Sequence, residues 1–427
     1  MFFRLVLSLV ASCLFVFGQG IHGVVVDATS HTPVAGAWVS ADGAIVKTAS
    51  NGEFTFKSNA KYVDLRAAGY GRVHLLAEPD MRVPLSPLRV RALYMSFWAV
   101  SSQTMRAHIY ETAAKAHLNA VVIDVKGDMG MVAFRTSSIP MVAKTNANRV
   151  ITISDPPALI ADLHKRGLYA IARIVTFKDS PLALARPDLA VKTADGKLFA
   201  DNERLHWTDP FSQVVQDYNI RIAVEAAKAG FDEIEFDYVR FPDHKGLQFS
   251  KETTEKSRRE TISGFLGQAQ KALNPYNVFL SADNFGYVAW NQGDTGIGQC
   301  FEDIGKVVDY ISPMLYPSGF RFGIPGVRNP LDDPYRIIYA SLEKAKQRTG
   351  FSGIVFRPWL QAFTDYAFDH RPFGKTQLRQ QIKAAEDAGA QGWLLWEPRN
   401  HYPTQALAEL ATEIWWKEKE PVQAAHR

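Results

Sequence analysis

A row of carboxylates lies on one face of a predicted strand near the middle of the chain. The segment at residues 230–242, GFDEIEFDYVRFP, alternates Glu233, Glu235 and Asp237 with apolar residues. Alternate side chains of an extended chain share a face, so the three acids point the same way. A core strand has little use for such a row, and the Phe-Pro pair after Arg240 ends the strand. Asp237 therefore lies where the chain leaves the sheet, and we predict that it is the centre of an active site.

A second carboxylate, Asp283, ends the next predicted strand along the chain. Glycoside hydrolysis uses two carboxyl groups: one acts as nucleophile or base, and the other, with a raised pKa, protonates the leaving oxygen. We predict Asp237 as the nucleophile or base and Asp283 as the general acid, with Glu397 as the alternative acid. Neighbouring strands lie about 4.8 Å apart, which leaves both retention and inversion of the sugar configuration open.

These residues need a scaffold, and the chain from residue 91 onward alternates short apolar segments with amphipathic helical patterns. Strands are expected near 92–99, 119–126, 168–176, 232–240, 277–284, 310–316, 353–360 and 391–397. Eight βα repeats over 91–417 are typical of a (β/α)8 TIM barrel. The alternative is a doubly wound open sheet, which usually carries a Gly-rich phosphate loop after its first strand, where this chain has Ser96-Phe97-Trp98. We therefore predict an α/β protein with a TIM barrel.

Active sites of such barrels lie at the carboxyl ends of the strands, and strand parity selects the side chains that point inward. We predict that Arg240, in the loop after its strand, positions substrate or restrains Asp237. The full set of residues predicted to bind substrate is Trp98, Asp124, Lys126, Arg173, Arg240, Tyr316, Arg357, Trp359, Trp396 and Glu397. Structural roles are the alternative, because an unpaired charge inside a barrel is very costly. Lys126, Arg173 and Arg357 would then neutralise Asp124 or Glu235, and Glu235, one layer below Asp237, would need a cationic partner.

The first 18 residues have one positive charge, an apolar run and small residues at their end, which predicts a secretory signal peptide over 1–18. The alternative interpretation is a lipoprotein box at Val10-Ala11-Ser12-Cys13, with Cys13 lipidated. Either interpretation predicts an exported protein, in the periplasm, outside the cell or attached to the envelope. Only Cys300 would otherwise remain in the mature chain, so no intramolecular disulfide is expected.

Short alternating segments broken by Gly, Asn, Asp and Pro predict a small all-β sandwich over 19–80. Its Gly23-Val24-Val25-Val26-Asp27, Gly52-Glu53-Phe54 and Ala68-Gly69-Tyr70 blocks resemble the carboxypeptidase-regulatory-like β-sandwich of exported bacterial proteins. That resemblance implies a spacer or adhesive module without catalysis. A linker of restricted flexibility is expected over 81–90, where Pro84 and Pro87 lie, and a polar tail over 418–427.

Four blocks of the predicted barrel resemble a bacterial family that is classed with glycoside hydrolases and has a TIM-barrel domain. They are the segment 230–242, the segment NAVVIDVKGD at 119–128, SADNFGY at 281–287 and GWLLW at 392–396. The resemblance implies glycosidase-like chemistry and a carbohydrate substrate. Glu397 departs from the pattern, because an Asn is common at that position. More distantly, the position of Asp237 resembles that of the nucleophile in amylase-type barrels, which is an analogy of fold.

Composition and charge exclude other classes of protein. The chain has 427 residues, 47% of them hydrophobic, and a net charge of +4 without a basic block, so a nucleic-acid partner is not expected. We expect no cofactor, no metal site, no transmembrane helix and a monomer. Two functions remain: a secreted glycoside hydrolase acting on a poly- or oligosaccharide, and a non-catalytic carbohydrate-binding barrel tethered at the cell envelope.

Overall fold

The computed structural model describes residues 20–413, and their contacts divide them into two compact units. The first contains residues 20–65 and Val73–Leu85, and the second contains Arg66–Arg72 and the described chain from Ser86 onward. The predicted signal peptide at 1–18, with its alternative lipid attachment at Cys13, and the tail predicted at 418–427 lie outside the described residues.

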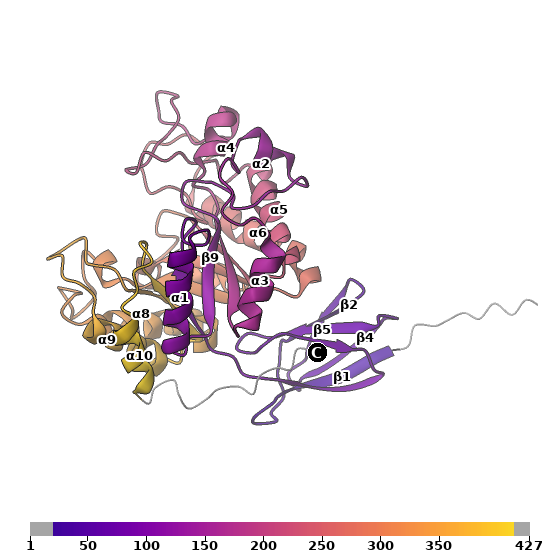
Figure 1. The fold of residues 1–427 in the computed structure, drawn as a ribbon. Coiled ribbons are helices and arrows are strands. Elements are labelled where there is room, and N and C mark those ends of the chain that lie inside the picture. The colour runs from indigo at the N-terminus through magenta and orange to yellow at the C-terminus, as the bar shows by residue number, and fades with distance from the viewer. Residues whose placement is uncertain (1–19, 414–427) are drawn as a thin grey trace, which may run out of the picture. The chain divides into compact units, whose positions relative to one another are not determined.

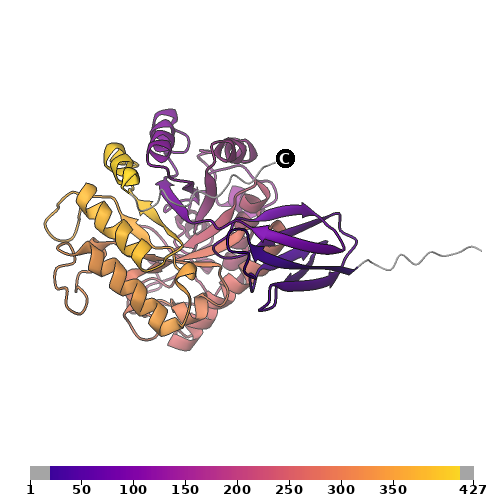
Figure 2. The same ribbon diagram turned by 90° about the horizontal axis from the view of Figure 1, so that it is seen from below.

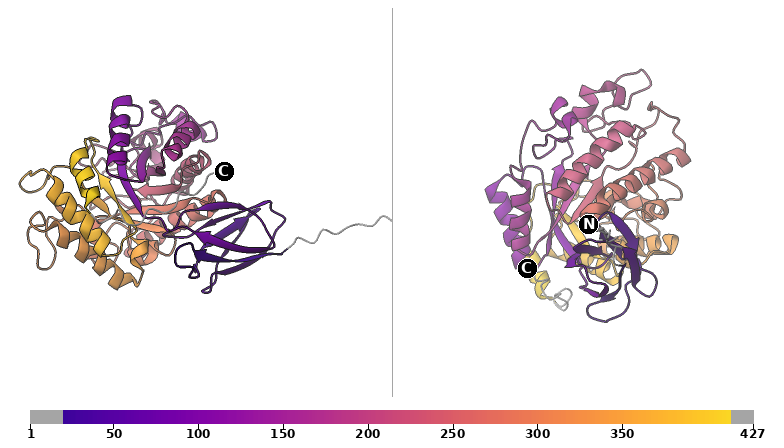
Figure 3. Two further views of the ribbon diagram at one scale, coloured as in Figure 1. Left: turned by 60° about the horizontal axis from the view of Figure 1, so that its bottom comes forward. Right: turned by 90° about the vertical axis from the view of Figure 1, so that its right-hand side faces the viewer.

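The first unit is built from seven strands, drawn in indigo and violet in Figure 3. They are β1 (Gly20–Asp27), β2 (Trp38–Ala41), β3 (Ala44–Lys47), β4 (Glu53–Lys57), β5 (Tyr62–Arg66), β6 (Val73–Leu76) and β7 (Asp80–Leu85). They form a three-stranded sheet in the order β4-β1-β7 and a four-stranded sheet in the order β3-β2-β5-β6. In β4, Phe54 and Phe56 are buried while Glu53, Thr55 and Lys57 are exposed, which is the alternation of a half-buried strand.

The linker predicted over 81–90 is largely strand in the structure. Met81, Val83 and Leu85 are the buried members of β7, which pairs in parallel with β1, and β8 begins at Val90. Pro84 is tolerated because β7 is an edge strand of its sheet, where a missing N–H breaks no interior ladder.

The second unit is the predicted TIM barrel, which the structure confirms. Eight parallel strands close in the order β10-β11-β12-β13-β14-β15-β8-β9. They are β8 (Val90–Met95), β9 (Ala120–Lys126), β10 (Tyr169–Val175), β11 (Glu233–Asp237), β12 (Phe279–Phe285), β13 (Tyr310–Met314), β14 (Trp359–Gln361) and β15 (Gly392–Trp396). Strand β14 is much shorter than predicted, because Pro358 precedes it and residues Gly353–Val355 form a 3-10 turn, η5.

Helices surround these strands, as the view along the barrel in Figure 2 shows. They are α1 (Gln103–Lys115), α2 (Pro140–Lys144), α3 (Pro156–Lys165), α4 (Ser180–Ala185), α5 (Gln213–Lys228), α6 (Glu255–Leu273), α7 (Phe301–Ile304), α8 (Pro334–Thr349), α9 (Lys375–Asp387) and α10 (Thr404–Thr412). Short helices α2 and α4 belong to the loops after β9 and β10 and lie in the upper part of Figure 1. Within residues 20–413, no helix is long and apolar enough to cross a membrane.

Local signals in the sequence explain where the long helices begin and end. The side chain of Thr254 accepts a hydrogen bond from the backbone of Ser257, and Ser257 returns one, so a capping box starts α6. Gly350 takes the left-handed conformation (φ 70°) that ends α8. On α5, Val215, Ile222 and other buried residues form the face that packs on the barrel.

The barrel interior is apolar on one side of its axis and polar on the other. Val90, Ala92, Tyr94, Ala120, Val122, Ile171, Trp359 and Leu394 form a separate buried cluster inside the strands. The polar part begins at the amino end with Glu233, whose carboxylate accepts hydrogen bonds from Arg357 Nη1 at 2.7 and 2.9 Å and from the Tyr169 hydroxyl at 2.9 Å. Glu233 and Arg357 are fully buried, so the ion pair fixes the first layer of the core.

We expect Arg357→Met to lower the free energy of unfolding by about 3–5 kcal/mol, because it leaves the Glu233 carboxylate buried without its cation. Urea unfolding followed by circular dichroism measures this. The double variant Glu233→Gln/Arg357→Met removes both charges and should recover a large part of the loss. A loss below about 1 kcal/mol in Arg357→Met would contradict the assignment of this pair as a support of the fold.

Candidate active site

Arg173, on β10, is the cation around which the carboxyl ends of three strands meet. Its guanidinium contacts Asp237 Oδ2 (Nη2, 2.5 Å; Nε, 3.0 Å), Asp124 Oδ1 (Nη1, 2.7 Å) and Asp128 Oδ1 (Nη2, 2.8 Å). Burial acts to lower the pKa of Arg173, but the charges of Asp128, Asp237 and Asp124 outweigh it and raise that pKa well above its ordinary value. The arginine is therefore a permanent cation that orients three carboxyl groups.

The two predicted catalytic residues lie on adjacent strands at the same depth. In the parallel pairing of β11 with β12, Phe236 faces Ala282, and Asp237 and Asp283 each follow by one residue. Asp237 Oδ2 is held by Arg173, and Asp237 Oδ1 accepts the backbone N–H of Tyr238 at 2.6 Å. Asp283 Oδ1 accepts the indole N–H of Trp359 at 2.7 Å. Two carboxyl groups in two different electrostatic environments thus meet at one place.

Asp283 is poised to carry a proton. Burial raises its pKa well above the ordinary value, and the charges of Glu235 and Asp237 raise it further, while Arg173 acts in the opposite direction. The residue is 1% exposed and directly neighbours Glu235, which shares the barrel interior one layer below. A carboxyl group in this environment stays neutral where an ordinary aspartate is ionised, as a general acid must.

Within residues 20–413, Glu235 has no cationic partner, contrary to the expectation from the sequence. Its side chain is fully buried, and Asp283 and Ser312 lie beside it without a hydrogen bond of normal geometry to either carboxyl oxygen. Burial raises the pKa of Glu235 to about 7, and the charge of Glu233 adds to this effect. Arg357, whose charge acts to lower the pKa of Glu235, is already paired with Glu233. Protonation of Glu235 therefore replaces the missing ion pair.

Aromatic side chains form one wall of the site. The ring of Tyr94 stacks on that of Trp396 with centroids 3.9 Å apart, and Trp359 meets Trp396 edge-on at 5.3 Å. The guanidinium carbon of Arg173 lies 4.8 Å from the centre of the Trp396 ring. Burial raises the pKa of Tyr316 well above the ordinary value, and the charges of Asp283 and Asp237 add to this effect. Tyr316 therefore lies within electrostatic range of both catalytic candidates. The predicted aromatic residues Tyr316, Trp359 and Trp396 are thus brought together.

Asp124 joins this wall to the charged cluster. Its carboxylate accepts the hydroxyl of Tyr94 at 2.6 Å and the backbone N–H of Phe97 at 3.2 Å, besides its contact with Arg173. Burial raises the pKa of Asp124 to about 6 in spite of Arg173, with a further contribution from the charge of Asp128. The side chain is 2% exposed, so Asp124 positions Arg173 and Tyr94.

Three predicted substrate-binding residues lie away from this cluster. The ammonium of Lys126 is fully buried between the strands and α5, where it contacts Asp179 Oδ2 at 2.7 Å, Val175 O at 2.8 Å and Asn219 Oδ1 at 2.9 Å. Arg357 belongs to the amino end of the barrel. Glu397 Oε2 accepts the backbone N–H of His401 at 2.8 Å and so restrains the loop after β15. All three have structural partners.

The remaining two, Trp98 and Arg240, belong to loops that follow β8 and β11. Trp98 is 52% exposed and touches Phe97 edge-on. The guanidinium of Arg240 lies over the rings of Trp207 and Tyr238, at 4.9 and 5.3 Å from their centres. Burial lowers the pKa of Arg240, while the charges of Tyr238 and Asp237 act to raise it. Arg240 thus lies within electrostatic range of Asp237 without pairing with it.

Tyr94 and Asp128 are the site residues that the sequence argument missed. Tyr94 shares strand parity with Trp98, so the same rule that selected Trp98 as an inward residue was sufficient to find it. Asp128 lies in the loop after β9, where strand parity no longer applies. Its position two residues after the end of a barrel strand was the available signal.

Comparison with known proteins agrees with this fold. Residues 92–402 match the family described as "Putative glycosyl hydrolase domain". The glycoside hydrolase domain of PgaB (BpsB) from Bordetella bronchiseptica is similar in structure, with a TM-score of 0.55 and 14% identity over 76% of this chain and 99% of that chain. The β-galactosidase from Marinomonas ef1 has a TM-score of 0.53 and 11% identity, over 76% and 59% of the two chains.

A hypothetical protein from Ruminiclostridium thermocellum ATCC 27405 is 36% identical over 45% of this chain and 96% of that chain, with a TM-score of 0.40. No curated protein matches. The first two likenesses, at 14% and 11% identity, concern the fold alone. The family match covers well over half of the 427 residues. The chain therefore belongs to this family of glycosyl hydrolase domains, and its class of enzyme is that of the glycoside hydrolases.

Proposed function

We propose that the protein is an exported glycoside hydrolase that cleaves a poly- or oligosaccharide, with Asp237 as nucleophile or base and Asp283 as general acid. The observation that supports this most is the contrast between two neighbouring carboxyl groups. Asp237 accepts two hydrogen bonds from the guanidinium of Arg173 and is the anion of an ion pair. Asp283 is buried beside Glu235, which favours its neutral form. One anion and one proton donor are the two groups that the reaction requires.

In the proposed reaction, the neutral carboxyl of Asp283 gives its proton to the oxygen of the leaving sugar as the glycosidic bond breaks. The carboxylate of Asp237 either bonds to the anomeric carbon or removes a proton from the attacking water. In both versions Arg173 keeps Asp237 oriented, and Trp359 orients Asp283 through its indole N–H. Of the three rings of this wall, Tyr94 and Trp359 are buried, and the half-buried ring of Trp396 is the one against which a sugar can stack.

The part of the proposal that concerns export rests on the amino-terminal sequence. An apolar run follows a single positive charge at Arg4 and precedes small residues. An exported protein meets polysaccharides of the cell envelope or of its surroundings, which suits a hydrolase of long sugar chains. Fractionation of expressing cells, with mass determination of the mature amino terminus, tests this and also detects a lipid on Cys13.

Replacement of either catalytic candidate should abolish turnover and leave binding intact. We expect Asp237→Asn and Asp283→Asn each to lower kcat by about 10³-fold or more, since an amide neither attacks nor transfers a proton. Release of reducing ends from a glycan panel measures turnover, and calorimetry measures binding. Asp217→Asn, on the exposed side of α5, is the matched control.

A parent protein that releases no reducing ends from any member of the panel would contradict hydrolysis. If that protein still bound glycans, and bound them less tightly in the Asp237→Asn form, the non-catalytic carbohydrate-binding barrel would be the better description.

The pH profile should depend on Glu235. The general acid must be protonated, so kcat/KM falls as the pH rises through the pKa of Asp283. Above its own pKa of about 7, Glu235 is ionised and its negative charge raises the pKa of Asp283; Glu235→Gln removes that charge. We expect the alkaline limb of the profile to move to lower pH in Glu235→Gln, while Glu260→Gln on the exposed face of α6 leaves it in place. An unmoved limb would mean that Asp283 is not the acid.

The Glu235→Gln variant should be more stable than the parent protein at alkaline pH. The folded-state pKa of Glu235, about 7, lies above its ordinary value of 4.5, so the folded protein binds this proton more tightly than the unfolded chain does. Stability is therefore lost as the pH rises through the window from 4.5 to about 7, by on the order of 3 kcal/mol. Glu235→Gln should lack this loss in urea unfolding at pH 5 and pH 8. Parallel pH dependences of parent and variant would contradict a buried, protonated Glu235.

A further inference from the structure

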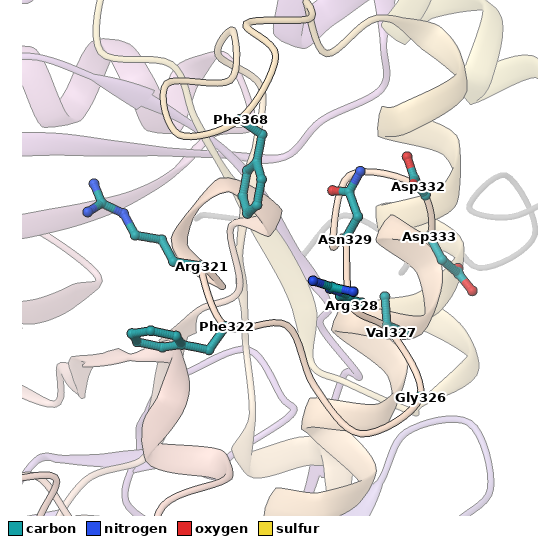
Figure 4. Close-up of a pocket in the computed structure, with 9 residues that line it drawn as sticks. All are labelled: Arg321, Phe322, Gly326, Val327, Arg328, Asn329, Asp332, Asp333 and Phe368. Carbon is teal, nitrogen blue, oxygen red and sulfur yellow. The ribbon is translucent and has the colours of Figure 1, made fainter.

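The loops that follow β13 and β14 form an open hollow whose lining includes two arginines and two aspartates. Arg321, Phe322, Arg328, Asn329 and Asp332 come from the loop after β13, and Phe368 comes from the loop after β14 (Figure 4). Figure 4 shows Arg321 and Phe322 extending to the same side and the ring of Phe368 reaching down between Arg321 and Asn329. Because both loops leave the carboxyl ends of barrel strands, the hollow opens on the same end of the barrel as Asp237 and Asp283.

The cations of this hollow are free and its anions are engaged. Within residues 20–413, neither Arg321 nor Arg328 has an ion pair or a side-chain hydrogen bond, and both are exposed. Asp332 lies 3.5 Å from Arg371, and Asp333 caps α8 by accepting the backbone N–H of Arg336 at 3.0 Å. The two arginines of the lining are therefore the charged groups of the hollow that have no protein partner among the described residues. Guanidinium groups bind carboxylates with two parallel hydrogen bonds.

A series of aromatic rings leads from the catalytic pair to this hollow. Tyr316, beside Asp283, meets Phe363 edge-on with centroids 5.4 Å apart, and Phe363 stacks on Tyr366 at 6.0 Å and 17°. Exposure rises outward: Tyr316 and Phe363 are half-buried, and Tyr366 is 53% exposed. Tyr366 also lies within electrostatic range of Arg321. The exposed ring of Tyr366, at the outer end of this series, suits stacking against a sugar unit.

A buried polar network holds the two loops together. The Ser318 hydroxyl donates to Asp365 Oδ1 at 2.6 Å and accepts from Gln361 Nε2 at 2.7 Å, so the loop after β13 is tied to the loop after β14. Burial acts to raise the pKa of Asp365, but the hydrogen bonds from Ser318 and from the backbone N–H groups of His370, Phe368 and Ala367 hold it at about 2. The carboxylate therefore stays charged and the loop pair stays ordered around neutral pH.

The loop that carries the free arginine Arg321 is anchored separately. The hydroxyl of Tyr287 accepts the backbone N–H of Phe322 at 2.9 Å and donates to Gly323 O at 3.2 Å. Gly323 takes φ 66°, and a Cβ there would lie 2.2 Å from Val327 O, so this tight turn needs glycine. A preorganised loop binds a ligand at a lower entropic cost than a mobile one.

We propose that this hollow is a distal subsite for acidic sugar units, in which Tyr366 stacks on a ring and Arg321 and Arg328 pair with carboxylates of the bound chain. The proposal rests on the function proposed above and narrows it: the substrate is an acidic polysaccharide, and the bond that is cleaved lies several units away from the unit in the hollow. The stacking series Tyr316, Phe363 and Tyr366 connects the two positions.

Binding without turnover tests this subsite. The full chain carrying Asp237→Asn is titrated with polygalacturonate, alginate and hyaluronan as acidic probes, with methyl-esterified polygalacturonate as the uncharged counterpart and chitosan as the cationic one. We expect the acidic probes to bind more tightly than the ester, and more weakly as salt is added. Arg321→Gln/Arg328→Gln and Tyr366→Ala should each weaken binding about tenfold or more. The control Arg221→Gln, on the exposed face of α5, should leave binding unchanged.

Equal affinity for polygalacturonate and its ester, no binding of any acidic probe, or unchanged binding by the double arginine variant would each overturn the subsite. Turnover is assayed separately on the parent protein. If the parent protein cleaves neutral glycans in a manner that depends on Asp237 and shows no preference for acidic ones, hydrolysis is supported and the acidic subsite is contradicted. If acidic polymers bind in a manner that depends on the two arginines but are not cleaved, the subsite is supported and the proposed hydrolysis is contradicted.

Discussion

The ion cluster around Arg173 is the interaction on which the mouth of the barrel depends. One guanidinium faces Asp124, Asp128 and Asp237, which come from β9, the loop after it, and β11. Three carboxylates this close repel one another, and only the shared cation makes their approach tolerable. The same contacts fix the rotamer of Asp237, because Nε and Nη2 of Arg173 both reach its Oδ2. Charge neutralisation and orientation of a reactive group are thus one feature of the structure.

The buried acids on β11 are stabilised in different ways at different depths of the barrel. At the amino end, Glu233 has a dedicated cation in Arg357. At the mouth, Asp237 has Arg173. Between them, Glu235 has neither, and protonation is the remaining way to keep an acid inside the protein. Because Glu235 neighbours Asp283, its ionisation state also influences the pKa of Asp283, the residue proposed as the general acid. Burial raises the pKa values of both Glu235 and Asp283, because no cation among the described residues pairs with Glu235 in the layer between Glu233 and Asp237.

The barrel, the pairing of Asp237 with Asp283 and the inward direction of Arg173 were predictable, because each follows from strand order and regular alternation. Lys126 and Arg357 were predicted to face the mouth of the barrel, but each lies where the regular geometry of its strand is interrupted. On β9, a register shift places Lys126 opposite Ile174, which faces the helices, so Lys126 leaves the inward set. Strand β14 begins only at Trp359, and Arg357 therefore lies at the amino end of the barrel. Neither a bulge nor a shortened strand has a clear signature in one sequence. The side chain of Glu397 lies outside the cluster for a related reason, since it follows β15 and bonds to its own loop.

Tyr238, the residue after Asp237, contributes to the site through its backbone conformation. Tyr238 has φ 48°, a left-handed conformation that bulky residues rarely adopt, and it turns the chain out of the barrel as the strand ends. Its N–H donates to Asp237 Oδ1, while its ring lies 4.6 Å from the Lys178 ammonium and 5.7 Å from the ring of Trp207. These contacts offset a conformation that glycine would adopt more easily. A glycine at this position would relax the turn but lose the ring contacts that hold the backbone N–H of residue 238 toward the second oxygen of Asp237. Arg173 and Tyr238 thereby hold one oxygen each of the same carboxylate, Arg173 through its charge and Tyr238 through its backbone N–H.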